Sequence, residues 1–164
     1  MLRTRLASPE DTDAIARIYN EGIEDRLATF ETRPRTADDV RGWFDGVHPV
    51  VVAEDGGRIF AFASTSTYRP RDCYAGIAEF SVYVAREARG RGAGRVVMEA
   101  LIVEAERAGF WKLVSRVFPQ NTASLRLLRS VGFREVGRYE KHGKLDGVWL
   151  DTVIVERLLP ANIR

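Results

Sequence analysis

The chain has 164 residues, of which 45% are hydrophobic and 29% charged, and its formal net charge is +2. This is the composition of an ordinary globular protein, and the length fits a single domain over residues 1–164. Intrinsic disorder is thereby excluded, and the small net charge gives no case for nucleic-acid binding.

Cysteine, histidine and apolar patterning exclude further classes of protein. The lone Cys73 makes no internal disulfide, and His48 and His142 stand without neighbouring cysteines or paired carboxylates, so no metal site is predicted. Residues 1–5 lack the apolar run of a signal peptide, and no segment has the roughly 18 apolar residues of a membrane span. We therefore expect a cytoplasmic protein with no membrane partner, in which both histidines are exposed polar residues.

Hydrophobic periodicity predicts strands and helices along the whole chain. Residues 2–7 alternate as in a strand, and Ser8-Pro9-Glu10-Asp11 has the N-cap, proline and acidic first turn of a helix start. The expected elements are a strand over 2–7, helices from residue 9 and over 37–44, strands over 49–54, 58–67 and 79–84, a helix opened by 89–94 and ended by residue 109, a strand over 112–118, a helix from 121 to 132, and strands over 134–141 and 148–158. This order predicts an α/β fold, a mixed sheet with helices on both faces.

A glycine-rich turn separates the strand over 79–84 from the next helix. Its sequence is Arg89-Gly90-Arg91-Gly92-Ala93-Gly94. Glycines let backbone N–H groups approach a phosphate at a helix N-terminus, and arginines around the turn pair with phosphate in bidentate fashion. The spacing is not that of a dinucleotide fingerprint, and no Lys-Ser/Thr pair follows, which disfavours NAD and ATP. The turn predicts a pyrophosphate site; the alternative is a tight turn with a solvated basic face.

Two motifs here resemble those of a known family. Arg89-x-x-Gly92-x-Gly94 matches the Q/R-x-x-G-x-G/A signature of the GCN5-related N-acetyltransferases, and residues 121–133 resemble their second motif. Within that superfamily the chain looks like the phosphinothricin acetyltransferases, and residues 143–151 look closer still to their arsinothricin-resistance relatives. The similar segments are Tyr19-Asn20-Glu21-Gly22, Ala28-Thr29-Phe30-Glu31, Glu79-Phe80-Ser81-Val82-Tyr83-Val84 and Lys141-His142-Gly143.

The resemblance implies the superfamily fold, a V-shaped mixed sheet in which two parallel strands splay to admit the pantetheine arm of acetyl-CoA. The cosubstrate contacts that it implies are Val82, Tyr83, Val84, Arg89, Gly90, Arg91, Gly92, Ala93, Gly94, Arg95 and Asn121. Free backbone groups of the strand would bind the pantetheine amides as a further strand would. Asn121 is equally well explained as an ordinary helix N-cap.

Glu79 is the expected catalytic base. The attacking amine must lose a proton, and Glu79 stands where the phosphinothricin acetyltransferases carry a catalytic glutamate. A surface strand glutamate is the alternative. Many of these enzymes have a tyrosine or histidine after Leu127, but this chain has Leu128, so no general acid is assigned.

Substrate contacts are expected from Phe30, Arg71 and Tyr74. Arg71 matches an arginine at the same distance from the glutamate in phosphinothricin acetyltransferase, and it would pair with an acidic group. Phe30 and Tyr74 would wall the pocket, although each is equally explained as a core or loop anchor. Residues 144–148 lengthen a hairpin relative to the commoner pattern, where substrate preference can shift.

The expected reaction moves acetyl from acetyl-CoA to the α-amine of a glutamate-like antimetabolite, such as phosphinothricin, arsinothricin or methionine sulfoximine. The alternatives are acetylation of another small amine or of a protein N-terminus, and a non-catalytic CoA-binding module. Because relatives are often dimers, a homodimer is expected.

Overall fold

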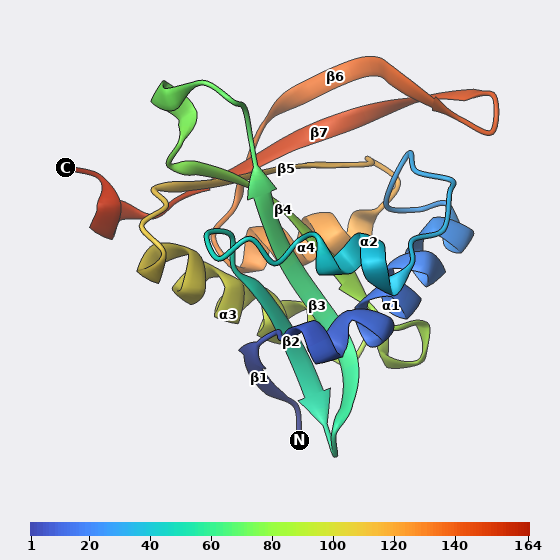
Figure 1. Ribbon diagram of the computed structural model, residues 1–164. Coiled ribbons are helices and arrows are strands. Elements are labelled where there is room, and N and C mark those ends of the chain that lie inside the picture. The colour runs from blue at the N-terminus through green and yellow to red at the C-terminus, as the bar shows by residue number, and fades with distance from the viewer.

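A seven-stranded sheet lies between helices on both of its faces in the computed structural model, which describes residues 1–164 (Figure 1). The strand order is β1-β2-β3-β4-β5-β7-β6, and β4 and β5 form the parallel pair among antiparallel neighbours. The elements are β1 (Arg3–Leu6), α1 (Thr12–Asp25), α2 (Ala37–Arg41), β2 (Val50–Asp55), β3 (Arg58–Thr67), β4 (Ile77–Val84), α3 (Ala93–Arg107), β5 (Lys112–Val117), α4 (Thr122–Ser130), β6 (Arg134–Leu145) and β7 (Val148–Leu158), with 3-10 turns η1 (Pro9–Asp11), η2 (Asp72–Tyr74), η3 (Arg86–Ala88) and η4 (Pro160–Asn162). The predicted mixed α/β fold is confirmed.

The C-terminal ends of two elements lie three or more residues from those expected. The helix α2 ends at Arg41 rather than at residue 44. The strand β6 continues to Leu145 rather than ending at residue 141, because Asp146 and Gly147 form a tight turn with φ of 51° and 79° and keep β6 paired with β7. An Asp-Gly pair between strands is a strong hairpin signal, and it explains the extension.

The two faces of the sheet pack on separate hydrophobic cores. One core joins the sheet to α3 and α4, and the other joins it to α1 and α2. On β4, Phe80 and Val82 belong to the α3 side and Tyr83 to the α1 side, as the predicted alternation requires. The same alternation places Glu79 and Ser81 on the α1 side of β4.

Strands β4 and β5 separate halfway along their length. Their parallel pairing stops after Glu79 and Val114, although β4 continues to Val84 and β5 to Val117. Beyond the last pair, Ser115 Oγ donates a hydrogen bond to the carbonyl oxygen of Phe80 at 2.8 Å. The second half of β4 therefore has no strand partner on the β5 side, which confirms the expected V-shaped opening.

The start of α1 is held by a buried carboxylate. Asp11 is 7% exposed and accepts hydrogen bonds from Arg5 at 2.7 and 2.9 Å and from the Ser8 amide at 2.8 Å. The hydrogen bonds from Arg5 hold the pKa of Asp11 below its usual range. Asp11 thus ties β1 to the first helix.

Replacing Asp11 with Asn is expected to lower the free energy of unfolding by about 1.5–3 kcal/mol at pH 7, because charge-assisted hydrogen bonds are lost. A group whose pKa is depressed by folding stabilises fully above its unfolded pKa, about 4, and loses that effect as the pH falls through the folded value. The Tm difference between wild type and Asp11→Asn should therefore shrink toward pH 3. Asp13→Asn, at an exposed position in the same helix, is the control. If the Tm difference between wild type and Asp11→Asn were as large at pH 3 as at pH 7, the ion pair would not be its cause.

Candidate active site

A cleft of about 430 Å³ lies where the V opens toward the start of α3. Its lining includes most of the predicted cosubstrate contacts: Val82, Tyr83, Val84, Arg89, Gly90, Gly92, Gly94, Arg95 and Asn121. Arg91 and Ala93 are not among the lining residues: Arg91 is exposed, and Ala93 is buried at the first position of α3. The fold thus gathers residues from β4, the glycine turn and α4 around one space.

The glycine turn presents backbone rather than side chains to this cleft. Gly90 and Gly92 have φ of 79° and 82°, a left-handed conformation that favours glycine. Gly92 is the N-cap of α3, so no side chain caps the first-turn amides. At Gly94 an added Cβ would lie 3.0 Å from Leu127 and 3.3 Å from Val84, so this helix start packs closely against β4 and α4. Exposed amides at a helix N-terminus favour an anion.

Cations beside the turn are partly neutralised by α1. Arg89 pairs with Asp25 at 2.5 Å, and Arg86 pairs with Asp25 and Glu24 at 2.9 and 3.1 Å. Hydrogen bonds from Arg86, and then from Arg89, lower the pKa of Asp25. A phosphate in the cleft would share Arg89 with Asp25, whereas Arg95 pairs only with Glu99 of its own helix.

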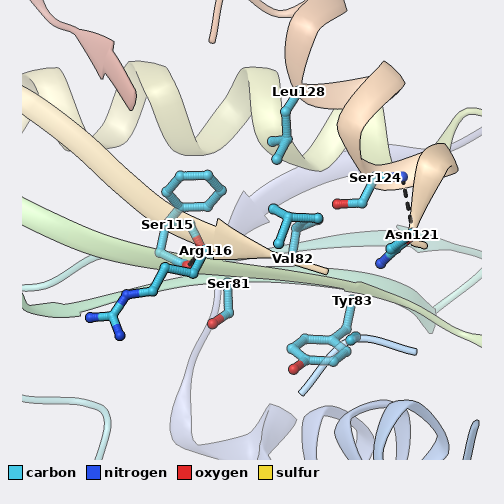
Figure 2. Close-up of a pocket in the computed structure, with 11 residues that line it drawn as sticks. Ser81, Val82, Tyr83, Ser115, Arg116, Asn121, Ser124 and Leu128 are labelled. Atoms are coloured by element: carbon cyan, nitrogen blue, oxygen red, sulfur yellow. Dashed lines mark hydrogen bonds between the residues drawn. The ribbon is translucent and has the colours of Figure 1, made fainter. Parts of the chain in front are cut away.

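A second pocket, of about 360 Å³, opens on the α1 side of the sheet. A small space of about 50 Å³, lined by Ser81, Val82 and Asn121 among others, lies between this pocket and the cleft (Figure 2). Tyr83 lines all three spaces. The cleft and the second pocket therefore meet at the middle of β4, and we call the small space between them the junction.

Glu79 lines the second pocket at the last residue where β4 pairs with β5. Its side chain is partly buried and makes no hydrogen bond or ion pair with another residue. Ser66 stands directly opposite on β3 and also lines the pocket. An unpaired carboxylate beside the junction can accept a proton from an amine, directly or through water.

The roof of this pocket comes from the loop after α1 and from the β6–β7 hairpin. Phe30, a predicted pocket residue, lines the pocket and packs edge-on against Phe118 with ring centroids 4.8 Å apart. A Cβ at Gly143 would lie 2.9 Å from the Phe30 ring, so the hairpin approaches the loop closely. Arg26 also pairs with Asp146 at the hairpin tip, at 3.1 Å. The extended hairpin thus helps to close the pocket.

Arg71 and Tyr74, the other predicted substrate contacts, do not line this pocket. They lie at the 3-10 turn η2, where Arg71 stands over the Tyr74 ring at 5.9 Å and Tyr74 packs edge-on against Tyr68. The hypothesis that Tyr74 is a loop anchor matches this packing. A substrate role for either residue stays a prediction.

Side chains at the junction show which groups can exchange protons. Leu128 is 1% exposed and lines the junction, where it has no proton to give. Burial raises the pKa of Tyr83, whose ring lies between Tyr19 and Phe62, so its phenol keeps its proton at neutral pH. Asn121 caps α4 by accepting a hydrogen bond from the Ser124 amide at 3.2 Å, and it also lines the cleft, so its two predicted roles are compatible.

Sequence reasoning missed several residues of the second pocket. His142, expected to be an exposed polar residue, is exposed but lines the pocket 3.2 Å from Arg116, as measured between Nε2 and Nη1. Arg116, Thr152 and Ser115 also line it. His142 lies in an irregular part of β6, where the register against β7 shifts between Tyr139 and Gly143 and Lys141 has a φ of 48°.

Comparison with known proteins agrees with this geometry. Residues 15–133 match the acetyltransferase (GNAT) family. The chain is 35% identical to phosphinothricin N-acetyltransferase of Alcaligenes faecalis, over 96% of this chain and 83% of that protein. It is 33% identical to the L-methionine sulfoximine/L-methionine sulfone acetyltransferase of Salmonella typhimurium, over 93% and 91% of the two chains.

Solved structures give the same result. The phosphinothricin acetyltransferase of Sinorhizobium meliloti in complex with acetyl-CoA superposes with a TM-score of 0.89, at 30% identity, covering 96% of this chain and 88% of that one. The chain therefore belongs to the GNAT acetyltransferase family. It is an acetyl-CoA-dependent N-acetyltransferase of the phosphinothricin and methionine sulfoximine acetyltransferase type.

Two further properties of the structure concern membranes and metal ions. No helix has both the length and the apolar character needed to cross a membrane. No three His, Cys, Asp or Glu side chains gather where they could hold a metal ion.

Substituting valine for Gly92 tests the cleft. The side chain strains a backbone with φ of 82° and intrudes where a phosphate must approach, so we expect coenzyme A affinity to fall at least about 10-fold, as measured by calorimetry. Gly57→Val is the matched control, because Gly57 has φ of 80°, equally open surroundings and a place in the distant β2–β3 turn. Equal coenzyme A affinities in the two variants would place the phosphate site elsewhere.

Proposed function

We propose that the protein transfers acetyl from acetyl-CoA to the α-amine of a glutamate-like antimetabolite such as phosphinothricin, arsinothricin or methionine sulfoximine. The observation that carries the proposal is the position of Glu79, an unpaired carboxylate in a pocket that meets the cleft at the junction. The names of the two curated relatives support this substrate class.

The cleft fits a phosphorylated, extended cosubstrate. The turn at Gly90 and Gly92 has open space where a Cβ would stand, and the strand edge from Val82 to Val84 has no neighbour on the β5 side. Bound acetyl-CoA supplies an activated thioester. The amides at the start of α3, with Arg89 and Arg95, would hold its diphosphate, and the β4 edge would hold its arm.

Within this arrangement the residues of the chain prepare the amine. Glu79 attracts the acceptor's ammonium group and takes a proton from it, leaving the lone pair that attacks the acetyl carbon. The bond from that carbon to the sulfur of coenzyme A then breaks, and the leaving thiolate takes up the second proton that the nitrogen loses, directly or through water. The Phe30 roof and the hairpin cover part of the pocket, and such covering strengthens charge interactions beneath it. Acetylation removes the positive charge of the amine, so an inhibitor that mimics glutamate loses that resemblance.

Replacing Glu79 with Gln is expected to lower kcat at least about 100-fold, because the base is lost while the shape of the pocket is kept. Coenzyme A affinity should stay unchanged, since Glu79 does not line the cleft. Steady-state kinetics with acetyl-CoA and calorimetry measure the two effects. Glu10→Gln, at an exposed position before α1, is the control. Wild-type kcat in Glu79→Gln would exclude Glu79 as the base.

A panel of acceptors tests the substrate class. We expect turnover of phosphinothricin, arsinothricin and methionine sulfoximine to exceed that of spermidine and of an aminoglycoside at least about 10-fold in kcat/KM, because the pocket suits a small amino acid. Thiol release from acetyl-CoA measures all five. Preference for a polyamine or an aminoglycoside would contradict the proposal.

A further inference from the structure

The second pocket, which we now call the acceptor pocket because the proposed acceptor would bind there, contains a cation as well as the carboxylate of Glu79. Arg116 lines the pocket, and its guanidinium pairs with no carboxylate anywhere in the protein. Nor does Glu79 pair with Arg116, although both line the same space. Two opposite charges, each without a protein partner, form the complement of a zwitterion.

Strand geometry explains how these side chains come to share one face. Leu113 and Val117 of β5 belong to the α3-side core, so the alternation directs Arg116 to the opposite side of the sheet, with Glu79. On β7, Ile154 is the direct partner of Arg116, and Thr152 follows two residues along on the same face. Residues from three strands thereby meet in one pocket.

The guanidinium is contacted by a histidine ring and by no carboxylate. Arg116 Nη1 lies 3.2 Å from His142 Nε2, and the His142 ring stacks on Tyr139 with centroids 4.6 Å apart. This is the only hydrogen bond that Arg116 makes through its side chain, so most of its N–H donors remain available for a ligand. The contact orients the cation without neutralising it.

A buried hydroxyl beside the same pocket also lacks a partner. Thr152 is 2% exposed and lines the pocket, and its Oγ1 makes no hydrogen bond in the protein. Buried polar groups are nearly always satisfied, so this hydroxyl needs a partner such as an ordered water or a polar group of a ligand. This observation is independent of the charge on Arg116.

The position of Arg116 indicates which acidic group of the acceptor it would contact. It lines the junction as well as the pocket, and its guanidinium points away from Asn121 and lies on the Ser81 side (Figure 2). The reacting amine must lie at the junction, next to Glu79. In an α-amino acid the carboxylate shares a carbon with the amine, so it must lie close by as well.

We propose that Arg116 binds the α-carboxylate of the acceptor and that His142 is its positioning residue. This inference rests on the proposed function and narrows it, because a free α-carboxylate next to the amine is required. Arg116 is exposed at the pocket and pairs with no carboxylate, so polyamines and protein N-termini, which lack that group, would gain nothing from its charge. The acceptor class is thus the free α-amino acid.

The test compares methionine sulfone with its α-carboxamide, which differs only in the acidic group. In Arg116→Gln, the KM for methionine sulfone should rise about 10- to 100-fold, as expected when charge-assisted hydrogen bonds are lost, while kinetics with the amide stay within about two-fold. Arg3→Gln is the matched control, because Arg3 is an exposed, unpaired strand arginine at the opposite edge of the sheet. It should match the wild type with both acceptors.

Three results would overturn the inference. They are equal losses for the acid and the amide in Arg116→Gln, no loss for either, and loss of acid preference in Arg71→Gln instead. The last would assign the carboxylate to the turn at η2.

Direct binding separates this inference from the proposed function. Methionine sulfone is titrated calorimetrically into wild type and Arg116→Gln, each saturated with coenzyme A. If the wild type binds methionine sulfone and Arg116→Gln does not, the role of Arg116 in binding the carboxylate is supported. Should the wild type bind methionine sulfone without turning it over, only the proposed reaction fails. Absence of binding to the wild type overturns both.

The positioning role has its own readout. His142→Ala should raise the KM for methionine sulfone and leave kcat within about two-fold, because the cation is displaced but the base is not. His142→Gln should restore much of the wild-type KM, since its amide oxygen can accept the Arg116 hydrogen bond. Equal kinetics in His142→Ala and wild type would remove His142 from this role.

Discussion

The separation of β4 from β5 is the constraint on which the rest of the site depends. Strand pairing stops after Glu79 and Val114, and the backbone of β4 beyond this point has no neighbour on that side. An unpaired strand edge inside a protein requires some other hydrogen-bonding partner. Glu79 is the last residue of β4 that pairs with β5, so its side chain lies where the two strands begin to separate.

Charge is distributed differently on the two sides of this opening. Near the glycine turn, arginines are engaged by acidic residues of α1, as the Asp25 pair with Arg89 shows. Such exposed ion pairs stabilise the protein little and exchange readily for a phosphate. In the acceptor pocket, neither Glu79 nor Arg116 has a partner of opposite charge, and Arg116 contacts only His142. Selectivity for the acceptor is therefore expected to depend on charge more than binding of the cosubstrate does.

Sequence patterns predicted the parts of the site that are local in the chain. The glycine turn, the alternation of β4 and the start of α4 each depend on neighbouring residues, and the structure brings them together in one cleft. Sequence patterns did not predict the contact between Arg116 and His142, because these residues are 26 positions apart and meet only through the pairing of β5, β7 and β6. The Asp146-Gly147 turn begins the pairing of β6 with β7, but it does not determine the shift in register beside His142.

Arg71 shows what spacing along the chain leaves open. Its distance in sequence from Glu79 matches the pattern of the family that the chain resembles, but the irregular turn η2 places Arg71 over the Tyr74 ring and outside the lining of the second pocket, so its substrate role stays a prediction. Distance in sequence is a reliable guide within one strand or helix, where the backbone repeats. It is a poor guide across an irregular loop, where each residue's dihedrals are independent.

The β6–β7 hairpin connects these observations to specificity. It carries His142 to Arg116, brings Gly143 against Phe30, and docks its tip to the loop after α1 through Asp146. None of these residues lines the cleft where the cosubstrate is proposed to bind. Changes in hairpin length or sequence can therefore alter which acceptor fits while β4 and the glycine turn keep the same chemistry. Because the hairpin lies at the sheet edge, where length changes disturb the core least, it is the element through which this fold can change its substrate.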